Sequence, residues 1–495
     1  MTLVERTEID LVGNPNRVLC RLFIPGEEEL IRGTSRAREL IARVERLTDD
    51  QVETALKDTL HRYSTRHPDL EEHLDTHYSA VASLIPDSGN VSPDRRRLIG
   101  ALLTQEYAFE STAYFNPSIV RHPDQTGVPH GYVRFIMSIR AVGEGHMSTL
   151  IFRTGMIGPD ASIIVDPASV FATTRATRYT VLRNRLVLQS AINAGIDTAD
   201  LEFILGMLPD KFTPEELTAT LSQLTVSTGT LPHHEAIHHH LQELTRSSYE
   251  VDFPEDTTLT ERVLWPTASD ERRGLEDARF VLFTDDDGTQ YYRATYTGFD
   301  GTGVVSRLLE TDDFRTFSSM PLTGKAVLNK GVAFFPRKID GRYCALSRWD
   351  RESNSIAYSD DGYHWNEGET FHASSEPWEL IHVGNCGSPI ETGAGWLVLT
   401  HGAGPMREYA IGAMLLDRDD PTVVLGTYPG PLLSPTEEER NGYVPNVVYS
   451  CGSIVHKGTL ILPYGISDCR TTFATVNLES LLSAMQDVRV RRELI

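Results

Sequence analysis

The sequence predicts a mainly β protein: a five-bladed β-propeller with an N-terminal helical segment and a helical insertion. Short runs rich in Tyr, Phe, Val, Ile and Thr, broken by Gly and Asp-Gly turns, fill most of the chain. Five of these turns lead into similar strands, beginning at Gly131, Gly288, Gly341, Gly395 and Gly458. The last four follow one another at roughly 50- to 60-residue intervals, a period typical of four-stranded propeller blades.

Two stretches have a different periodicity and are predicted to be helical. Apolar and charged residues recur at three- and four-residue spacing over residues 28–84 and 171–246. The sequence therefore divides into an N-terminal, largely helical segment, a first propeller repeat, a helical insertion and the remaining repeats, with bounds 1–108, 109–170, 171–250 and 251–495. The apolar stripes of these helices must be buried either against the propeller or against another subunit, and the second case would make the protein a homo-oligomer.

Charge and composition exclude several classes of protein. The chain has 46 Lys and Arg against 69 Asp and Glu, a net charge of −23, which disfavours binding to nucleic acid or to anionic membranes. No apolar stretch has the length of a membrane-spanning helix, and the N-terminus does not resemble a secretory signal. The 5 cysteines contain no C-x-x-C pair, as in reduced cytosolic proteins. We therefore expect a soluble cytoplasmic protein.

Polar residues mark one end of every predicted hairpin. The strand before each Gly turn begins with polar residues, and the strand after the turn ends with them. The starting positions are Asn116, Asp277, Lys330, Asn385 and Asn446, and the ending positions are Arg140, Tyr296 to Asp300, Arg348, His401 and Asp468. If the hairpins are the inner strands of blades, these side chains converge on one mouth of the central channel and form a polar site.

Several motifs in these hairpins resemble glycoside hydrolase family 130, the inverting β-mannoside phosphorylases and related mannosidases on a five-bladed propeller. These motifs are FNPS, GLEDARF, the pair Asn329-Lys330 that precedes FFP, the pair Ser347-Arg348, GWLVLTHG, GYVPNVVYSCG and PYGISDCR. They span residues 110–475 and occur in the same order as in the family. Two features depart from the family. Its usual Glu-Asp-Pro-Arg reads Glu-Asp-Ala-Arg here, and the helical segments are additional to the minimal propeller.

A phosphorylase needs an acid for the leaving oxygen and cations that hold phosphate, whereas an inverting hydrolase needs a second carboxylate as base. Asp277 is the predicted acid, and the resemblance implies that it acts through a hydroxyl of the bound mannose. Glu276 is predicted to be structural, because neighbouring strand residues point to opposite faces. Lys330, Arg348 and His401 are predicted to form a cationic phosphate pocket. The alternatives are salt bridges to nearby acids for Lys330 and Arg348, and a plain histidine at a strand end for His401.

The sugar is expected to bind residues of the first and last repeats. Asn116, Arg140 and Asp468 are the predicted hydrogen-bonding partners, and Tyr464 and Arg470 are further candidates. Trp349 either stacks on a sugar face or covers the core.

One motif competes with this interpretation. His234-Glu235-Ala-Ile-His238 matches the H-E-x-x-H signature of zinc proteases. The third ligand of the metzincin pattern is missing, and a run of histidines at 233–240 raises the chance of an accidental match. We therefore predict no metal site.

Together these features predict phosphorolysis of a β-mannoside, with a β-1,2- or β-1,4-linked mannosyl disaccharide or oligosaccharide as the expected substrate. The product is α-mannose 1-phosphate, formed with inversion. No cofactor is expected, and inorganic phosphate is the co-substrate. The alternatives are an inverting β-mannosidase or mannosyltransferase on the same site, or a carbohydrate-binding propeller without catalysis.

Overall fold

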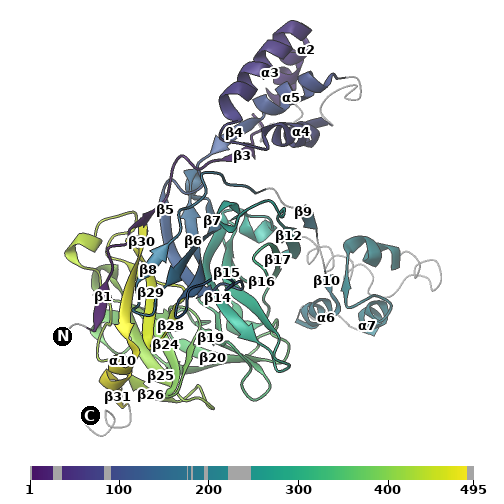
Figure 1. Ribbon diagram of the computed structural model, residues 1–495. Helices are drawn as coiled ribbons and strands as arrows, with labels where there is room; N and C mark the ends of the chain where they lie inside the picture. The colour runs from purple at the N-terminus through teal and green to yellow at the C-terminus, as the bar shows by residue number, and fades with distance from the viewer. Residues whose placement is uncertain are drawn as a thin grey trace. The chain divides into compact units, whose positions relative to one another are not determined.

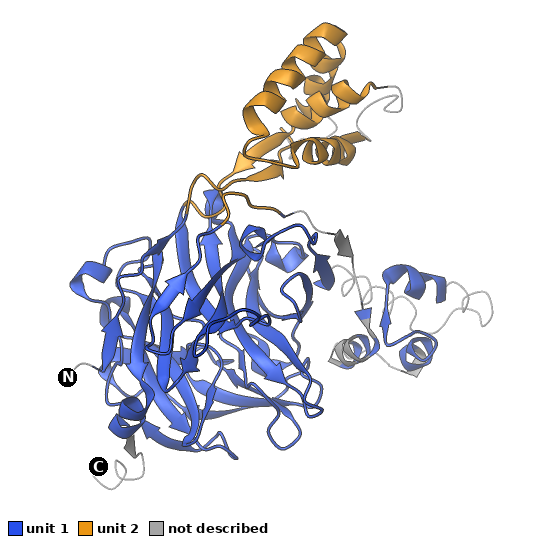
Figure 2. Ribbon diagram, in the orientation of Figure 1, with its two compact units in different colours: residues 1–13, 112–168, 174–495 blue, residues 14–111, 169–173 orange. Residues whose placement is uncertain are grey.

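The computed structural model describes residues 3–25, 36–82, 91–174, 177–179, 182–193, 199–220 and 247–487 (Figure 1). The chain forms two compact units (Figure 2). Unit 1 comprises Met1–Gly13, Thr112–Ala168 and Thr174–Ile495, and unit 2 comprises Asn14–Ser111 and Ser169–Thr173. No helix among the described residues is long and apolar enough to cross a membrane.

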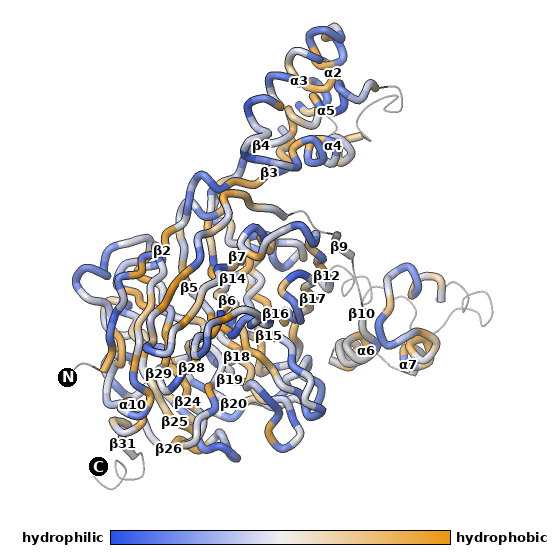
Figure 3. Tube along the Cα trace, viewed as in Figure 1, coloured by the Kyte–Doolittle hydropathy of each residue, from blue (hydrophilic) through white to orange (hydrophobic). Residues whose placement is uncertain are grey.

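Unit 2 is largely helical. Its helices are α2 (Arg36–Glu45), α3 (Asp49–Tyr63), α4 (Leu70–Val81) and α5 (Pro93–Leu102), and β3 (Leu19–Leu22) pairs with β4 (Thr104–Tyr107). Thr48 and Gln51 form a capping box that begins α3. Helices α2 and α3 carry hydrophilic and hydrophobic residues side by side (Figure 3), and their apolar faces bury Ile41, Val44 and Val52.

Unit 1 contains five antiparallel meanders, and each includes one of the predicted hairpins. The first has β5 (Ala113–Arg121), β6 (Val133–Val142), β7 (Ser148–Ile157) and β8 (Ile163–Val165). The second has β12 (Tyr249–Asp252), β14 (Gly274–Thr284), β15 (Gln290–Phe299), β16 (Val304–Thr311) and β17 (Thr316–Pro321). The third has β18 (Ala333–Phe334), β19 (Tyr343–Ser347), β20 (Asn354–Ser359) and β21 (Gly368–His372).

The fourth meander has β22 (His382–Asn385), β24 (Gly395–Ala403), β25 (Tyr409–Leu416) and β26 (Val424–Thr427). The fifth has β27 (Val448–Tyr449), β29 (Thr459–Ile466) and β30 (Arg470–Asn477). The mainly β class is thus confirmed, whereas the arrangement of the meanders as five blades of a propeller stays a prediction.

The N-terminal residues belong to the fifth meander. β1 (Val4–Arg6) and β2 (Leu11–Val12) both pair antiparallel with β30, with Val4 opposite Val476 and Leu11 opposite Thr471. The sequence predicts a single N-terminal segment over 1–108, but the structure divides this region between the two units. Strands this short carry too little periodicity to reveal their distant partner.

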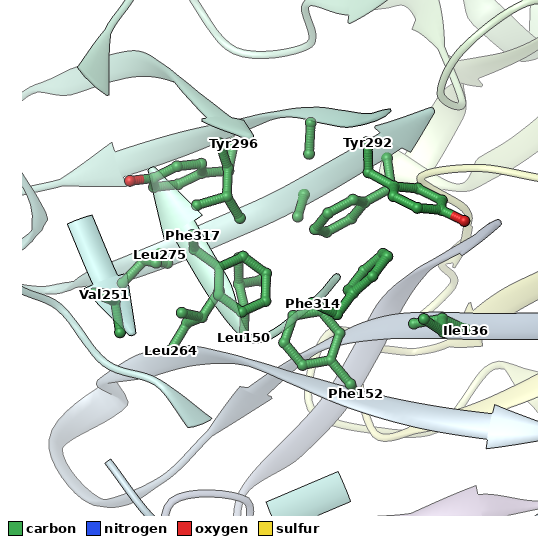
Figure 4. Packing of buried hydrophobic residues seen from close by; sticks show 14 of the residues in the cluster. Ile136, Leu150, Phe152, Val251, Leu264, Leu275, Tyr292, Tyr296, Phe314 and Phe317 are labelled. Atoms are coloured by element: carbon green, nitrogen blue, oxygen red, sulfur yellow. The ribbon is translucent and has the colours of Figure 1, made fainter. Parts of the chain in front are cut away.

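An aromatic core holds the first two meanders together (Figure 4). Phe152 of β7 stacks on Phe317 of β17, with ring centroids 5.6 Å apart, and meets Phe280 of β14 edge-on at 6.1 Å. β14 also pairs in parallel with β7, where Gly274 lies opposite Ser148. A Cβ at Gly274 would lie 2.2 Å from the Ser148 hydroxyl, so this approach requires glycine. The core therefore fixes the strand that carries Asp277.

The insertion has a small apolar core, and its first strand pairs with β12 of the second meander. It contains β9 (Thr177–Tyr179), β10 (Leu182–Arg183), α6 (Asn184–Asn193), α7 (Ala199–Leu205) and β11 (Lys211–Phe212). Leu182, Val187, Leu201, Ile204 and Phe212 are buried together. The H-E-x-x-H motif at 234–238 and the histidine run at 233–240 lie outside the described residues.

Candidate active site

Two β-bulges place the central polar residues of the site. The ladder between β5 and β6 shifts between Phe115 and Ser118, and the ladder between β14 and β15 shifts between Glu276 and Arg279. Asn116 and Asp277 lie in these shifts with left-handed φ values of 53° and 56°. Left-handed backbone is costly for residues with a Cβ and concentrates at functional sites. The two bulges turn an amide and a carboxylate toward each other.

Asp277, in the second meander, is held by two neighbours from the first meander. Its Oδ1 accepts hydrogen bonds from Asn116 Nδ2 at 2.6 Å and from an Arg140 guanidinium nitrogen at 3.0 Å. The other terminal nitrogen of Arg140 donates to Glu276 Oε1 at 2.7 Å. Arg140 therefore bridges two consecutive carboxylates, and its side chain is only 16% exposed.

The position of Glu276 differs from the sequence expectation. Regular alternation would point Glu276 away from the face that carries Asp277, but the bulge interrupts the alternation and brings both carboxylates to Arg140. Lys330 also forms an ion pair with Glu276. The two neighbouring acids and the two cations thus form one cluster.

The pKa values of the two aspartates of the site are shifted in opposite directions. Burial alone would raise the pKa of Asp277, but the charges of Arg140, Lys330 and Arg279 hold this pKa well below its usual range, together with the Asn116 hydrogen bond. Burial raises the pKa of Asp468 to about 7, against the pull of Arg140 and with the help of the Asp277 charge. The cations around Asp277 thus favour its anion, and binding of an anionic ligand beside them would weaken that preference.

His401 is a neutral hydrogen-bond acceptor, and its predicted role as a cation is wrong. Its Nδ1 lies 3.0 Å from the backbone oxygen of Asn385, which only accepts, so Nδ1 carries the proton. Its Nε2 then accepts from Arg348 at 3.2 Å. Burial, followed by the charge of Arg348, lowers the pKa of His401 well below its usual value. The imidazole orients Arg348 and adds no charge.

Sequence analysis assigned no role to two further residues beside this cluster. Arg279 is 2% exposed, donates to the backbone oxygen of Asp277 at 3.1 Å and donates to the Tyr449 hydroxyl at 2.7 Å. The Tyr449 ring lies 4.8 Å from the His401 ring, between centroids. Arg279 occurs in the GLEDARF motif and Tyr449 in the VPNVVYS motif. Membership of these motifs is the sequence feature that could have identified both residues as part of the site.

Tyr464 and Arg470 lie apart from this cluster. Tyr464 is fully buried and its hydroxyl donates to Glu439 at 2.8 Å. Arg470 forms an ion pair with Asp10 at 3.4 Å. Both side chains line a cavity of about 570 Å³ beside the N-terminal strands. Neither is engaged with the carboxylates that hold Arg140.

Trp349 also has a partner of its own. The Lys325 ammonium lies 4.6 Å from the centre of its ring.

No group of three or more His, Cys, Asp or Glu suited to a metal ion is found in the part of the chain that the structure describes.

Comparison with known proteins places these features in a family. Residues 233–487 match the family model of glycoside hydrolase family 130, described as β-1,4-mannooligosaccharide phosphorylase. A 1,2-β-oligomannan phosphorylase of a Thermoanaerobacter species is 33% identical over 239 residues, which cover 45% of this chain and 75% of the relative. A β-1,2-mannobiose phosphorylase of Listeria innocua is 32% identical over 247 residues, which cover 46% of this chain and 65% of the relative.

A solved structure of the β-1,2-mannobiose phosphorylase from Listeria innocua, with β-1,2-mannobiose bound, is also similar to this chain. It aligns with a TM-score of 0.44 and 22% identity, covering 76% of this chain and 92% of that structure. The family match extends over half of the sequence and includes the strand pairs that carry Asp277, Lys330, Arg348, His401 and Asp468. The chain belongs to glycoside hydrolase family 130.

Proposed function

We propose that the protein is an inverting β-mannoside phosphorylase, with inorganic phosphate as co-substrate and no metal or organic cofactor. The observation that carries the proposal is the binding of Glu276 by both Arg140 and Lys330. An inverting hydrolase needs a second carboxylate that is free to deprotonate water. Glu276 is the carboxylate next to the acid, and two cations occupy it, so it is a poor base. Lys330, together with Arg348, suits an anionic nucleophile.

The reaction is a single displacement at the anomeric carbon. A phosphate oxygen bonds to C1 of the mannosyl group as the glycosidic C–O bond breaks, and the leaving oxygen receives a proton. Asp277 supplies this proton through a mannose hydroxyl, as the family resemblance implies. Lys330 and Arg348 hold the phosphate, and His401 orients Arg348. Asn116, Arg140 and Asp468 bind the sugar.

The substrate is proposed to be a β-1,2- or β-1,4-linked mannosyl disaccharide or oligosaccharide. The similar proteins are named as phosphorylases of β-1,2-oligomannan, β-1,2-mannobiose and β-1,4-mannooligosaccharides. The five meanders are proposed to be the blades of a propeller, with the polar strand ends of all five around one channel mouth.

Incubation with β-1,2- and β-1,4-mannobiose, with and without phosphate, tests this function. We expect consumption of one disaccharide only when phosphate is present, with α-mannose 1-phosphate identified by phosphorus NMR. Equal release of free mannose with and without phosphate would show a hydrolase instead. Transfer of mannose to a second sugar in the absence of phosphate would show a transferase.

A variant of His401 tests its proposed role as an acceptor. In His401→Phe the Arg348 guanidinium loses its partner, so the phosphate KM should rise about tenfold, the size expected for one hydrogen bond to a charged group. His401→Gln keeps a hydrogen-bond acceptor, so it should raise the phosphate KM less. Because the imidazole is neutral over the working range, the phosphate KM of the wild type should show no inflection from His401 between about pH 6 and 8. An inflection abolished by His401→Gln would contradict the assignment.

A further inference from the structure

The backbone of Asp277 is held in an unfavourable conformation. Its φ is 56°, in the left-handed region that residues with a Cβ seldom adopt. In the ladder between β14 and β15 the paired residues pass from Glu276 directly to Arg279, so the bulge takes Asp277 and Ala278 out of the ladder. A backbone of this kind persists only where neighbouring groups hold it. The position of the Asp277 carboxyl therefore depends on contacts beyond its own strand pair.

A second bulge of the same form lies in β5 and differs in one respect. The ladder with β6 is shifted around Asn116, whose φ is 53°, and the next residue along the chain is Pro117. The ring of a proline fixes the φ of that residue, so Pro117 stiffens the bulge in β5. In β14 the corresponding residue is Ala278, which has no such ring. The bulge that carries Asp277 thus gains less rigidity from its own sequence.

The side chain of Arg279 supplies support to this bulge. It is 2% exposed, and one terminal nitrogen of its guanidinium donates to the backbone oxygen of Asp277 at 3.1 Å. The other terminal nitrogen donates to the Tyr449 hydroxyl at 2.7 Å. Because the guanidinium is planar and rigid, fixing one of its nitrogens also fixes the other. Arg279 thus ties the peptide group at the bulge to β27 of the fifth meander.

Tyr449 is fixed by its own surroundings. Its ring lies 4.8 Å from the His401 ring, between centroids, and its backbone pairs with Gly465 of β29. The hydroxyl is therefore a fixed acceptor for the guanidinium. The same part of the fifth meander also holds the other bulge, since the Cys451 backbone N–H donates to the Pro117 backbone oxygen at 2.8 Å. Both bulges of the site are thus supported from one side.

We propose that Arg279 and Tyr449 are positioning residues that hold the Asp277 carboxyl in place for proton transfer to the sugar. Tyr449 fixes the guanidinium of Arg279, and the guanidinium fixes the peptide group of Asp277. The proposal rests on the proposed function for the role of Asp277 as the acid. It follows that loss of either contact should slow the step that needs the acid and should spare the binding of phosphate.

Tyr449→Phe tests this role, because it removes one hydroxyl and keeps the ring beside His401. We expect kcat on a β-mannobiose to fall about tenfold, the size expected for one hydrogen bond to a charged group, with the phosphate KM unchanged. In Asp277→Asn the acid is already gone, so adding Tyr449→Phe to that variant should cause no further fall in kcat. An unchanged kcat in the single variant, or a fall of the same size in both backgrounds, overturns the proposal.

Arg279→Lys tests the other half of the contact. Lysine keeps the positive charge but lacks the fork that joins the two acceptors, so kcat should fall at least as far as in Tyr449→Phe. The double variant should lose no more than Arg279→Lys alone, because both substitutions release the same peptide group. Losses that multiply in the double variant would show that the two residues act independently and would overturn the proposal.

Tyr292→Phe is a matched control in the second meander. Tyr292 is 3% exposed, and its hydroxyl donates to the backbone oxygen of Arg121 at 2.7 Å. The same substitution there removes one buried tyrosine hydroxyl bond away from the bulge, so kcat should stay at the wild-type value. A fall as large as that of Tyr449→Phe would show that any such loss slows the enzyme, against a positioning role.

A crystal structure of Tyr449→Phe reports on the bulge without any turnover. In the wild type the Asn116 amide nitrogen lies 2.6 Å from Oδ1 of Asp277, and we expect this distance to lengthen in the variant. An unmoved carboxyl would overturn the proposal. If the carboxyl moves but the wild type shows no phosphorolysis, the proposed function fails, whereas the hold of Arg279 and Tyr449 on Asp277 stands.

Discussion

Replacing Asp277 by asparagine should lower kcat on a β-mannoside by about 10²- to 10⁴-fold while phosphate still binds. The substitution keeps size and polarity and suits the left-handed backbone at this position, but it removes the transferable proton. In the variant, Asn116 and Arg140 donate to the amide oxygen of residue 277 in place of a carboxylate oxygen, so the cluster keeps its packing. Steady-state kinetics at varied phosphate would measure both effects.

The leaving group provides a control for the role of Asp277. An aryl mannoside hardly needs protonation, so it should partly rescue Asp277→Asn if the site accepts the aryl ring. The same substrate should not rescue Lys330→Ala or Arg348→Ala, in which phosphate is misplaced. Near wild-type activity of Asp277→Asn on the natural disaccharide would refute the assignment, and Glu276 would be the next acid to test.

Replacing Arg140 by methionine should lower both stability and activity. Arg140 is the bridge between Glu276 and Asp277, and removal of one partner from a buried ion pair costs about 3–5 kcal/mol of unfolding free energy. The 5 tryptophans all lie in unit 1, so urea unfolding followed by their fluorescence would report this unit alone.

The loss of unfolding free energy in Arg140→Met should depend on pH. Burial would raise the pKa of Asp277, and Arg140 is one of the charges that hold this pKa below its usual range. Removing Arg140 therefore costs most stability where Asp277 is ionised, and the cost shrinks as acidification protonates Asp277. The variant should therefore be closest to the wild type near about pH 4 and furthest from it near about pH 8. Arg470→Met is the matched control: its ion pair with Asp10 is exposed and should cost at most about 1 kcal/mol. Equal losses of unfolding free energy in Arg140→Met and Arg470→Met would contradict the bridging role of Arg140.

The hairpins and their polar ends could be read from the sequence because both depend on local patterns. Glycine turns at a regular interval and polar strand ends led to Asn116, Arg140, Asp277 and Lys330, which the structure brings into one cluster. The resemblance to glycoside hydrolase family 130 indicated the expected reaction, phosphorolysis of a β-mannoside. Local patterns were enough here because each hairpin carries its own part of the site.

What escaped sequence analysis depends on distant contacts or on departures from regular geometry. The bulge that turns Glu276 toward Arg140 breaks an alternation that sequence reasoning takes as regular. The neutrality of His401 follows from its burial beside Arg348, which no local pattern reveals. Arg470 is a further candidate sugar ligand from the sequence, but in the structure it binds Asp10, 460 positions away along the chain.

The pairing of β1 with β30 has a consequence for synthesis of the chain. Residues 14–111 make up most of unit 2 and contain both strands of the pair formed by β3 and β4. β1 is made long before its partner β30, which follows more than 450 residues later along the chain. At about 5–20 residues per second the first strand waits for roughly half a minute or more. During that interval an exposed strand edge is open to pairing with other nascent chains, so crowded polysomes are where this protein is most prone to aggregate.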